Sequence, residues 1–139
     1  MLELIVLLAI LIAIAGTVVP LVSAEIEDSR TSRAIHDASR IAAAVNRFAI
    51  DTGKQPRASE KASGASALLT SGASPERLPL GPVARLADRL GPEAAPPASA
   101  PAGWKGPYLG EVGADPWGRA YAVIVPAPGS RGRLWVLSA

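Results

Sequence analysis

The sequence predicts an α+β protein in which one long N-terminal helix packs against a small C-terminal antiparallel β-sheet. Three observations lead to this fold class. An uncharged apolar run extends from Leu4 to Ala24, an amphipathic pattern with helical spacing follows it, and two strand-like segments stand near the C-terminus. A chain of 139 residues allows one domain plus an appendage. Because much of the apolar content falls in the first 24 residues, we expect a small globular core.

The apolar run contains 21 residues. At about 1.5 Å per residue, a helix of this length crosses a hydrocarbon core of about 30 Å. Three interpretations are open: a cleaved secretory signal, a plain signal anchor, or a helix that packs against copies of itself. A signal peptide begins with positive charge, whereas the charged residue before this run is Glu3. A signal anchor explains the length but not Glu3, because acidic residues contribute little to topology. We therefore favour the third interpretation.

The run continues into an amphipathic helix, so that residues 1 to about 52 form one long helix. Pro20 lies inside the helical pattern, where a proline removes a backbone hydrogen bond and kinks the helix. After it, apolar residues recur at helical spacing: Ile35, Ala38, Ile41, Ala42, Val45, Phe48 and Ala49. Gly53 supplies a C-terminal cap and Pro56 follows as a helix breaker. The helix thus has an apolar half, residues 1–24, and an amphipathic half, residues 25–53.

Residues 54–102 form a variable region that is rich in Gly, Pro, Ser and Ala. Two short helices are predicted in it, around residues 60–70 and 82–90. The second helix has apolar residues on one face and charged residues on another. The Pro/Ala-rich stretch "PEAAPPASAPAG" is predicted to be an extended, exposed loop.

Residues 103–139 are predicted to form the short antiparallel sheet region, and they begin with "GWKGPYLGEVGADPWGRAYAVIVP". Asp115 is suited to cap a turn, Pro116 fixes φ, and Gly118 can take a positive φ. The segments "RAYAVIV" and "RLWVLS" predict two strands, and "PAPGSRG" between them predicts a hairpin. The clustered aromatic residues Trp104, Tyr108 and Trp117 are expected to staple the sheet to the long helix.

These features together resemble the type IV pilins and the pseudopilins of type II secretion. In the N-terminal helix the resemblance rests on Glu3 at the head of the apolar run and Pro20 17 residues later. The C-terminal part is similar to the "GW.GPYL…DPWG..Y" run of the major pseudopilin. Its matching residues are Trp104, Gly106, Pro107, Tyr108, Leu109, Asp115, Pro116, Trp117, Gly118 and Tyr121. The resemblance covers residues 1–53 and 103–138.

The resemblance implies a pilin-like structural subunit that polymerises into a filament. In that family the glutamate neutralises the N-terminal amine of a neighbouring subunit, which here gives assembly roles to Met1 and Glu3. The family glutamate lies two positions further from the mature N-terminus than Glu3 lies from Met1. Gly16 and Pro20 complete the expected assembly residues, because the carbonyl of Gly16 is the one that Pro20 leaves unpaired. We expect residues 14–21 to be the weakest part of the helix, kinked or locally melted after assembly.

The resemblance also implies a location and partners. The chain would lie in the bacterial inner membrane with its globular domain in the periplasm, and later in a periplasmic or extracellular filament. Its partners would be further copies of the same chain in a helical filament, the inner membrane before assembly, and the secretion or pilus assembly machinery. Two alternatives stay open. One is a type IV pilus subunit for adhesion, motility or DNA uptake, and the other is a monomeric membrane-anchored envelope binding module.

The sequence gives little support for catalysis or for a cofactor. Cys is absent, so the chain has no disulfide framework and no Cys-ligated metal site. The single histidine, His36, stands next to Asp37 on the long helix and is expected on its exposed side. No catalytic constellation or phosphate-binding loop is evident. We therefore expect no enzyme activity and no cofactor.

Metal ions and nucleic acids are also not expected as partners. The family's major pseudopilin has a calcium-binding loop after its last strand, where this sequence reaches Ser138 and Ala139. Glu111 and Asp115 are too few ligands for Ca²⁺, which takes about six oxygens or more. We therefore carry over the fold and the polymer role, but not calcium. The net charge is +2 and basic residues are interspersed with acidic ones, so nucleic-acid binding has little support.

Overall fold

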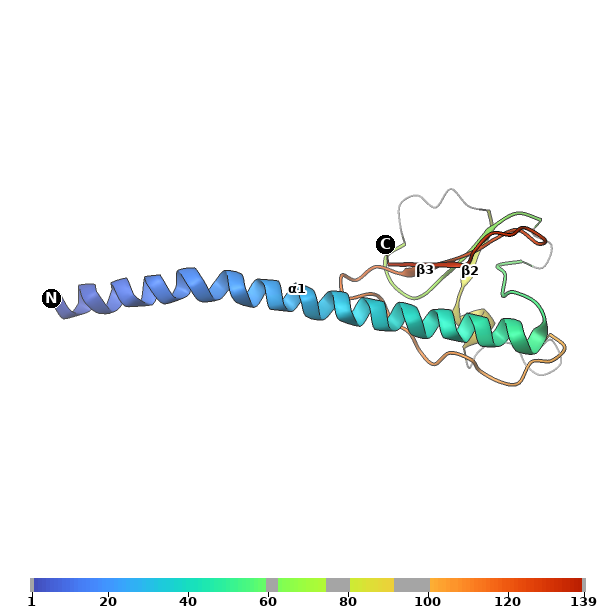
Figure 1. The fold of residues 1–139 in the computed structure, drawn as a ribbon, viewed down its shortest axis with the longest axis horizontal. Helices are drawn as coiled ribbons and strands as arrows, with labels where there is room; N and C mark the ends of the chain where they lie inside the picture. Colours follow the sequence, from blue (N-terminus) through green and yellow to red (C-terminus); the bar gives the residue numbers. More distant parts are fainter. Residues whose placement is uncertain (1, 60–62, 75–80, 92–100, 139) are drawn as a thin grey trace. The chain divides into compact units, whose positions relative to one another are not determined.

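The computed structural model of the chain describes residues 2–59, 63–74, 81–91 and 101–138. Its elements, in chain order, are α1 (Leu2–Thr52), β1 (Ser66–Leu69), β2 (Val83–Arg85), α2 (Ala87–Leu90), β3 (Tyr121–Val125) and β4 (Trp135–Ser138). The long N-terminal helix and the small sheet confirm the predicted α+β fold class (Figure 1). The chain divides into two compact units, Met1–Arg33 and Ala34–Ala139, which are described separately below.

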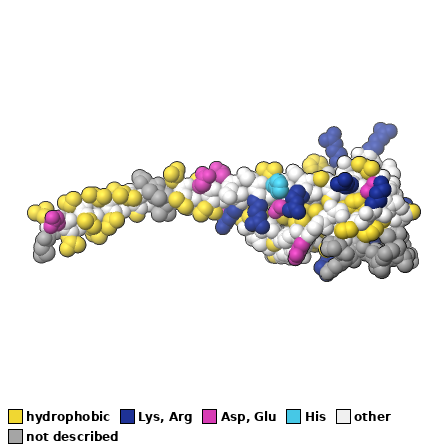
Figure 2. Space-filling model, turned by 90° about the horizontal axis from the view of Figure 1, so that it is seen from below, with side chains coloured by type: hydrophobic (Ala, Val, Ile, Leu, Met, Phe, Trp, Pro, Cys, Tyr) yellow, Lys and Arg dark blue, Asp and Glu magenta, His cyan; other side chains and the backbone are white. Residues whose placement is uncertain are grey.

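The first unit is the N-terminal part of α1, whose apolar side chains are exposed. The large apolar side chains from Leu2 to Ile14 are 53–81% exposed. Figure 2 shows hydrophobic side chains gathered along this part of the helix. In the described part of the chain, α1 is the one helix that is long and apolar enough to cross a membrane, judged by length and composition alone. The helix includes residues 14–21, whose weakening after assembly stays a prediction about the filament.

In the second unit, the C-terminal part of α1 buries one face against the sheet. The buried residues are Ala34, Ile41, Ala44, Val45 and Phe48, with the helical spacing that the sequence predicts. The predicted face is rotated slightly in the structure, because Ile35 is 63% exposed while Ala34 is buried. Burying a large apolar side chain completely contributes about 1.5–3 kcal/mol. This face therefore holds the sheet against the helix.

The sheet has the strand order β2-β1-β3-β4. β1 pairs antiparallel with β3, and β3 pairs antiparallel with β4. β1 pairs parallel with β2, so the prediction of a wholly antiparallel sheet is wrong and the sheet is mixed. Within this unit the strands lie over the C-terminal part of α1 (Figure 1). Leu68, Val123 and Val125 from the central strands join the helix residues in one hydrophobic core.

The sequence predicts a helix around residues 60–70, and this prediction is wrong. Ser66–Leu69 form β1, a central strand that pairs with β2 on one side and β3 on the other. Residues 60–62 lie outside the described part of the chain. The short run "ASALLTS" contains good helix formers, but an apolar run of this length is compatible with a strand as well. The segment forms a strand because it pairs with a neighbouring strand on each side.

The prediction of a helix around residues 82–90 is wrong for the first part of this range and right for its end. Val83–Arg85 form β2, and α2 covers only Ala87–Leu90. The apolar face of the prediction is partly right, because Leu86 and Leu90 are buried, whereas Val83 is 49% exposed. Most of the Pro/Ala-rich stretch lies outside the described residues. The variable region thus supplies two strands of the sheet, which the sequence did not indicate.

The C-terminal hairpin is confirmed. β3 and β4 pair antiparallel with Tyr121 opposite Ser138 and Ile124 opposite Trp135. In the connection, the N–H of Ser130 donates to the carbonyl of Ala127 over 3.2 Å, which closes a turn. This hairpin carries the last described residues of the chain to the edge of the sheet.

Candidate functional site

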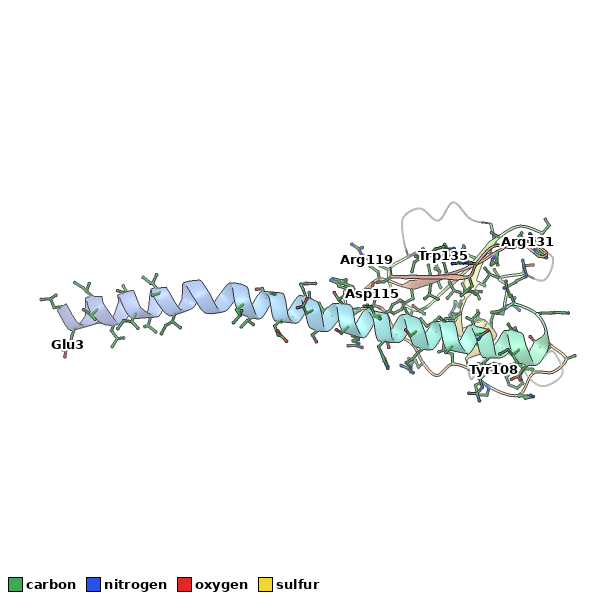
Figure 3. All side chains as sticks on the ribbon, viewed as in Figure 1. Glu3, Tyr108, Asp115, Arg119, Arg131 and Trp135 are labelled. Atoms are coloured by element: carbon green, nitrogen blue, oxygen red, sulfur yellow. The ribbon has the colours of Figure 1, made fainter. Side chains whose placement is uncertain are left out.

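The predicted assembly residues belong to the first unit. Glu3 lies in the first turn of α1 and is exposed (Figure 3). An acidic residue there interacts favourably with the helix dipole, by about 0.3–1 kcal/mol, so Glu3 already has a modest role in a single copy. Gly16 is exposed, and a Cβ at its position would meet nothing within 4 Å. Met1 and the side chain of Pro20 lie outside the described residues. The assembly roles of these four residues stay proposals.

The second group of predicted residues forms a tight turn around Asp115. The Asp115 carboxylate accepts hydrogen bonds from the backbone N–H groups of Trp117 over 3.0 Å and Arg119 over 2.8 Å. Gly118 has a φ of +84°, which is strained for other residues. The predicted cap at Asp115 and the positive φ at Gly118 are therefore confirmed. Pro116 fixes the backbone between them.

Asp115 also connects this turn to the edge strand. Its Oδ2 accepts a hydrogen bond from the Ser138 hydroxyl over 2.5 Å, and Asp115 is only 4% exposed. Burial acts to raise the pKa of Asp115. The hydrogen bonds from Ser138, Arg119 and Trp117 outweigh burial, so that the pKa lies below its ordinary value of 3.8. The ionised carboxylate thus ties the turn to β4.

The predicted aromatic staple between the sheet and the helix is supported in part, because Trp104 and Tyr108 pack against the core that α1 and the sheet share. The ring of Tyr108 packs edge-on against Phe48 of α1 at a centroid distance of 5.5 Å, and against Trp104 at 6.3 Å. Such edge-to-face pairs add about 0.5–1.5 kcal/mol beyond their buried area. Trp117 is 43% exposed, so its assignment to the staple is wrong. Trp117 follows a proline in a surface turn and contributes its backbone N–H to Asp115.

The "GW.GPYL" segment is fitted closely to the end of α1. A Cβ at Gly103 would collide with the carbonyl oxygen of Asp51, and the φ of Gly103 is +87°, so glycine is required there. Gly106 also has a positive φ, of +126°, ahead of Pro107. The N–H groups of Tyr108 and Leu109 both donate to the carbonyl of Leu90. This stretch therefore joins α1 to α2.

An ion pair that the sequence did not indicate lies beside this segment. The Lys105 Nζ donates to Asp51 Oδ1 over 2.9 Å. This bond lowers the pKa of Asp51 and raises the pKa of Lys105. The two residues are 54 positions apart, so no local pattern could have paired them. Tyr121, the last residue of the motif, is fully buried in β3.

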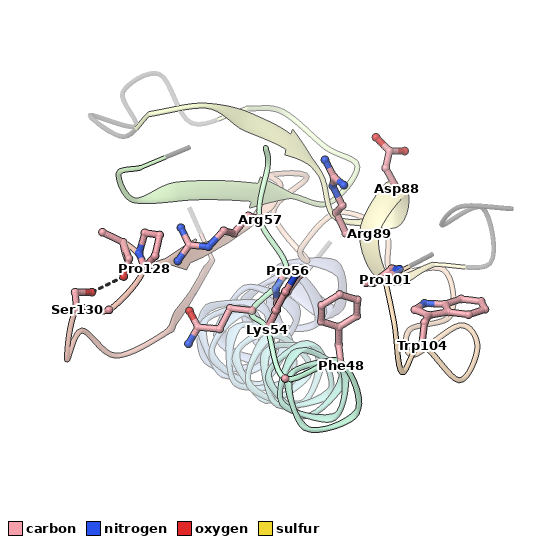
Figure 4. Close-up of a pocket in the computed structure, with 14 residues that line it drawn as sticks. Phe48, Lys54, Pro56, Arg57, Asp88, Arg89, Pro101, Trp104, Pro128 and Ser130 are labelled. Atoms are coloured by element: carbon pink, nitrogen blue, oxygen red, sulfur yellow. Dashed lines mark hydrogen bonds between the residues drawn. The ribbon is translucent and has the colours of Figure 1, made fainter. Parts of the chain in front are cut away.

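A pocket of about 590 Å³ lies near the C-terminal end of α1 (Figure 4). Its lining includes Phe48, Lys54, Trp104, Arg57 and Arg89. The two arginines are used by the fold. Arg57 donates to the carbonyl of Pro126 over 2.7 Å, and Arg89 donates to the carbonyl of Ala58 over 2.8 Å. The pocket therefore presents structural ties rather than an arrangement of catalytic groups.

The remaining chemistry of the described residues is limited. His36 is exposed, as expected, with a side chain that is 74% accessible, and its Nδ1 lies 3.9 Å from the Asp37 carboxylate. Among the residues that the structure describes, no group of three or more His, Cys, Asp or Glu is arranged to hold a metal ion.

Comparison with known families gives one match. The family model described as "Type II secretion system (T2SS), protein G" matches residues 86–139, which contain α2, the Asp115 turn and the C-terminal hairpin. Comparison with curated proteins gives no match, and comparison with solved structures gives none. The match supports the interpretation of this chain as a pseudopilin subunit of type II secretion. The apolar N-terminal helix is consistent with anchoring in the inner membrane. The C-terminal part of this chain is thus similar to type II secretion protein G.

Proposed function

We propose that this chain is a structural subunit that polymerises into a pilus-like filament, as the major pseudopilin of a type II secretion system. The observation that carries the proposal is the match of residues 86–139 to the protein G family. The N-terminal features support it independently, because an apolar helix headed by Glu3 lies outside the matched segment. The role is structural, and we propose no enzymatic activity.

The exposed apolar surface of α1 is suited to two environments, first the lipid of a membrane and then the other helices of a filament. A helix that is apolar on all sides is found in lipid or inside a bundle of other helices. The large apolar side chains from Leu4 to Ile14 are more than half exposed in a single copy. We propose that the inner membrane covers them first, with the globular domain in the periplasm. Helices of neighbouring subunits then cover them in the filament, where the assembly machinery of the secretion system is the further partner.

Glu3 would set the register between neighbouring subunits. An unpaired carboxylate in an apolar environment is costly, so such residues are usually functional and have a partner. We propose that the N-terminal amine of the next copy, at Met1, is that partner. The pair stabilises the assembly in one register only, much as a buried polar residue fixes the register of a coiled coil.

The test is the substitution Glu3→Leu in the full chain. We expect normal insertion into the membrane, since the change makes the helix more apolar, and loss of polymer. Leaving one partner of a buried ion pair alone costs about 3–5 kcal/mol, and the cost recurs at every subunit. Membrane fractionation measures insertion, and electron microscopy of sheared filaments measures polymer. Glu111→Leu is the matched control, because Glu111 is an exposed carboxylate on the second unit.

Several outcomes would contradict the proposal. Normal filament yield from Glu3→Leu, like that from the control, would refute the pairing of Glu3. A wild-type chain that stays monomeric in the membrane would instead favour an envelope binding module. A wild-type filament that supports adhesion, motility or DNA uptake, but not release of secreted proteins, would favour a type IV pilus subunit.

A further inference from the structure

An exposed stripe runs along the C-terminal edge of the sheet. Leu134 and Val136 pack against the hydrophobic core. Side chains of an extended chain alternate between two faces, so the residues between and around them point away from the core. They are Arg131, Arg133, Trp135 and Leu137, and all four are exposed. We call these four residues the β4 stripe; Trp135 and Leu137 belong to β4, and Arg131 and Arg133 precede it in the hairpin. Figure 3 labels Arg131 and Trp135.

The β4 stripe has the composition of a contact surface. Trp135 is 59% exposed and Leu137 is 42% exposed on an edge strand. Within the described residues, neither Arg131 nor Arg133 makes an ion pair. From Pro116 onward the chain carries arginines and no acidic residue, so the stripe is basic as well as apolar. Trp and Arg are the residue types most enriched among residues that dominate binding energy.

A surface of complementary character lies on the same chain. Residues 21–29 of α1 contain acidic residues and no Lys or Arg. Leu21 is 73% exposed, and Glu25 and Asp28 are exposed as well. These three residues have the spacing i, i+4, i+7, which places them on one face of the helix. Glu27 lies on another side of the helix and pairs with Arg30 over 2.9 Å, so Glu25 and Asp28 are the carboxylates of this face.

The two surfaces also agree in spacing. Arg133 lies two residues before Trp135, the first residue of β4, and two residues of extended chain span about 6.6 Å. Leu21 and Glu25 are four residues apart in a helix, a separation of about 6 Å. Each surface therefore offers an apolar group followed by a charged group at nearly the same interval, and the charges have opposite sign.

We infer that the β4 stripe of one copy binds residues 21–28 of α1 of a second copy, with Trp135 on Leu21 and Arg133 on Glu25. The inference rests on the proposed filament function. The two surfaces are different, so the contact is head-to-tail and leaves a free surface of each kind at the two ends of any oligomer. Such contacts propagate into a helical polymer when they do not close into a ring. Because Leu21 belongs to the apolar run, the contact forms fully only after the subunit leaves the membrane.

Charge reversal in the full chain tests the contact. We expect Arg133→Glu and Glu25→Arg each to reduce filament yield at least about tenfold, because like charges then face each other across the interface. The double variant Arg133→Glu/Glu25→Arg should recover most of the yield. Arg85→Glu is the matched control, since Arg85 is a 72% exposed arginine on the opposite edge strand of the same sheet. Its yield should stay at the wild-type level.

Cross-linking provides an independent measurement. The chain has no cysteine, so Glu25→Cys/Arg133→Cys introduces the only thiols. With a short bis-maleimide, filaments of this double variant should give a ladder of dimers, trimers and longer species. Each single-cysteine variant should give no ladder, because a head-to-tail contact brings the two different positions together.

Each contrary outcome has a distinct meaning. Normal filaments from Arg133→Glu, or a missing ladder in the double-cysteine variant, would overturn the contact while leaving the filament function in place. If Arg133→Glu loses yield and the added Glu25→Arg does not restore it, the contact is also overturned. That outcome would favour an anionic lipid surface as the partner of the β4 stripe. If the unmodified chain forms no polymer, the proposed function and the contact both fail.

Discussion

The two parts of α1 are both rich in apolar residues, but they place them in different surroundings. In the first part, an uncharged and mostly apolar run extends from Leu4 to Ala24, and its large apolar side chains up to Ile14 are exposed. In the second part, Ile41, Val45 and Phe48 recur at helical spacing and are buried. Apolar residues at helical spacing thus indicate a single partner surface, whereas a continuous apolar run indicates an apolar medium on all sides.

This difference has an energetic consequence. In the second part, each apolar side chain already contributes to the stability of a single folded subunit. In the first part, the same kinds of side chain contribute only when lipid or other subunits cover them. Truncation of an apolar side chain should therefore lower the free energy of unfolding of one subunit strongly in the second part of the helix and very little in the first.

The largest expected effect tests this comparison directly. We expect Phe48→Ala to lower the free energy of unfolding by about 3–5 kcal/mol, because it removes a buried ring and leaves a cavity in the core. Leu8→Ala, at a position that is 59% exposed, should change it by less than about 0.5 kcal/mol. Chemical unfolding of the full chain in detergent, followed by tryptophan fluorescence, measures both. Equal effects of the two substitutions would contradict the division of the helix.

A smaller effect is expected at the Asp115 turn, which belongs to the same compact unit as the second part of α1. Asp115 holds the turn and β4 together through three accepted hydrogen bonds, two from backbone N–H groups and one from Ser138. Asp115→Ala leaves these donors without their acceptor, and we expect a loss of about 2–4 kcal/mol. Ser138→Ala removes one of the bonds and should cost about 1 kcal/mol. If both variants unfolded at the wild-type denaturant concentration, the tie would have no energetic role.

The same carboxylate predicts a dependence of stability on pH. The pKa of Asp115 is depressed below 3.8 in the folded chain, so the ionised form stabilises the fold. This contribution is fully present above the ordinary pKa and is lost as the pH falls through the lower folded value. Asp115→Asn cannot titrate, so its stability deficit relative to wild type should shrink as the pH falls from 6 toward about 3. A deficit that is constant over this range would show that the charge is not what stabilises the turn.

The sequence predicts the long helix and the hairpin because both have strong local patterns. Periodicity defines the buried face of α1, and the strand-like segments on either side of "PAPGSRG" define β3 and β4. Prediction from the sequence fails for β1. Ser66–Leu69 lacks a distinctive pattern and becomes a strand through pairing with residues 83–85 and 122–125. Such pairings are tertiary, and propensity is a weak guide where they decide the structure.

The site follows the same division. The turn chemistry of Asp115 and Gly118 is local, so the sequence predicts it correctly. The bond from Ser138 to Asp115 joins residues 23 positions apart, and nothing in the sequence marks it. Trp117 was misassigned because a cluster of aromatic residues in sequence does not show which of them point into the core. The register of Glu3 depends on a second copy, so only the assembled filament can test it.

The smallest expected effect concerns the surface at the C-terminal end of α1. The ion pair between Lys105 and Asp51 is well formed, at 2.9 Å, but the Lys105 side chain is 73% exposed. Water and salt screen such a pair, so Lys105→Ala should lower the free energy of unfolding only slightly, and less at high salt. Lys54→Ala, an exposed lysine two residues beyond the helix end, is the control. A loss as large as that of Phe48→Ala would mean that the "GW.GPYL" segment is held to α1 mainly by this charge. The edge-to-face packing of Tyr108 on Phe48 would then be secondary, and the second part of the helix would depend on its surface rather than on its buried face.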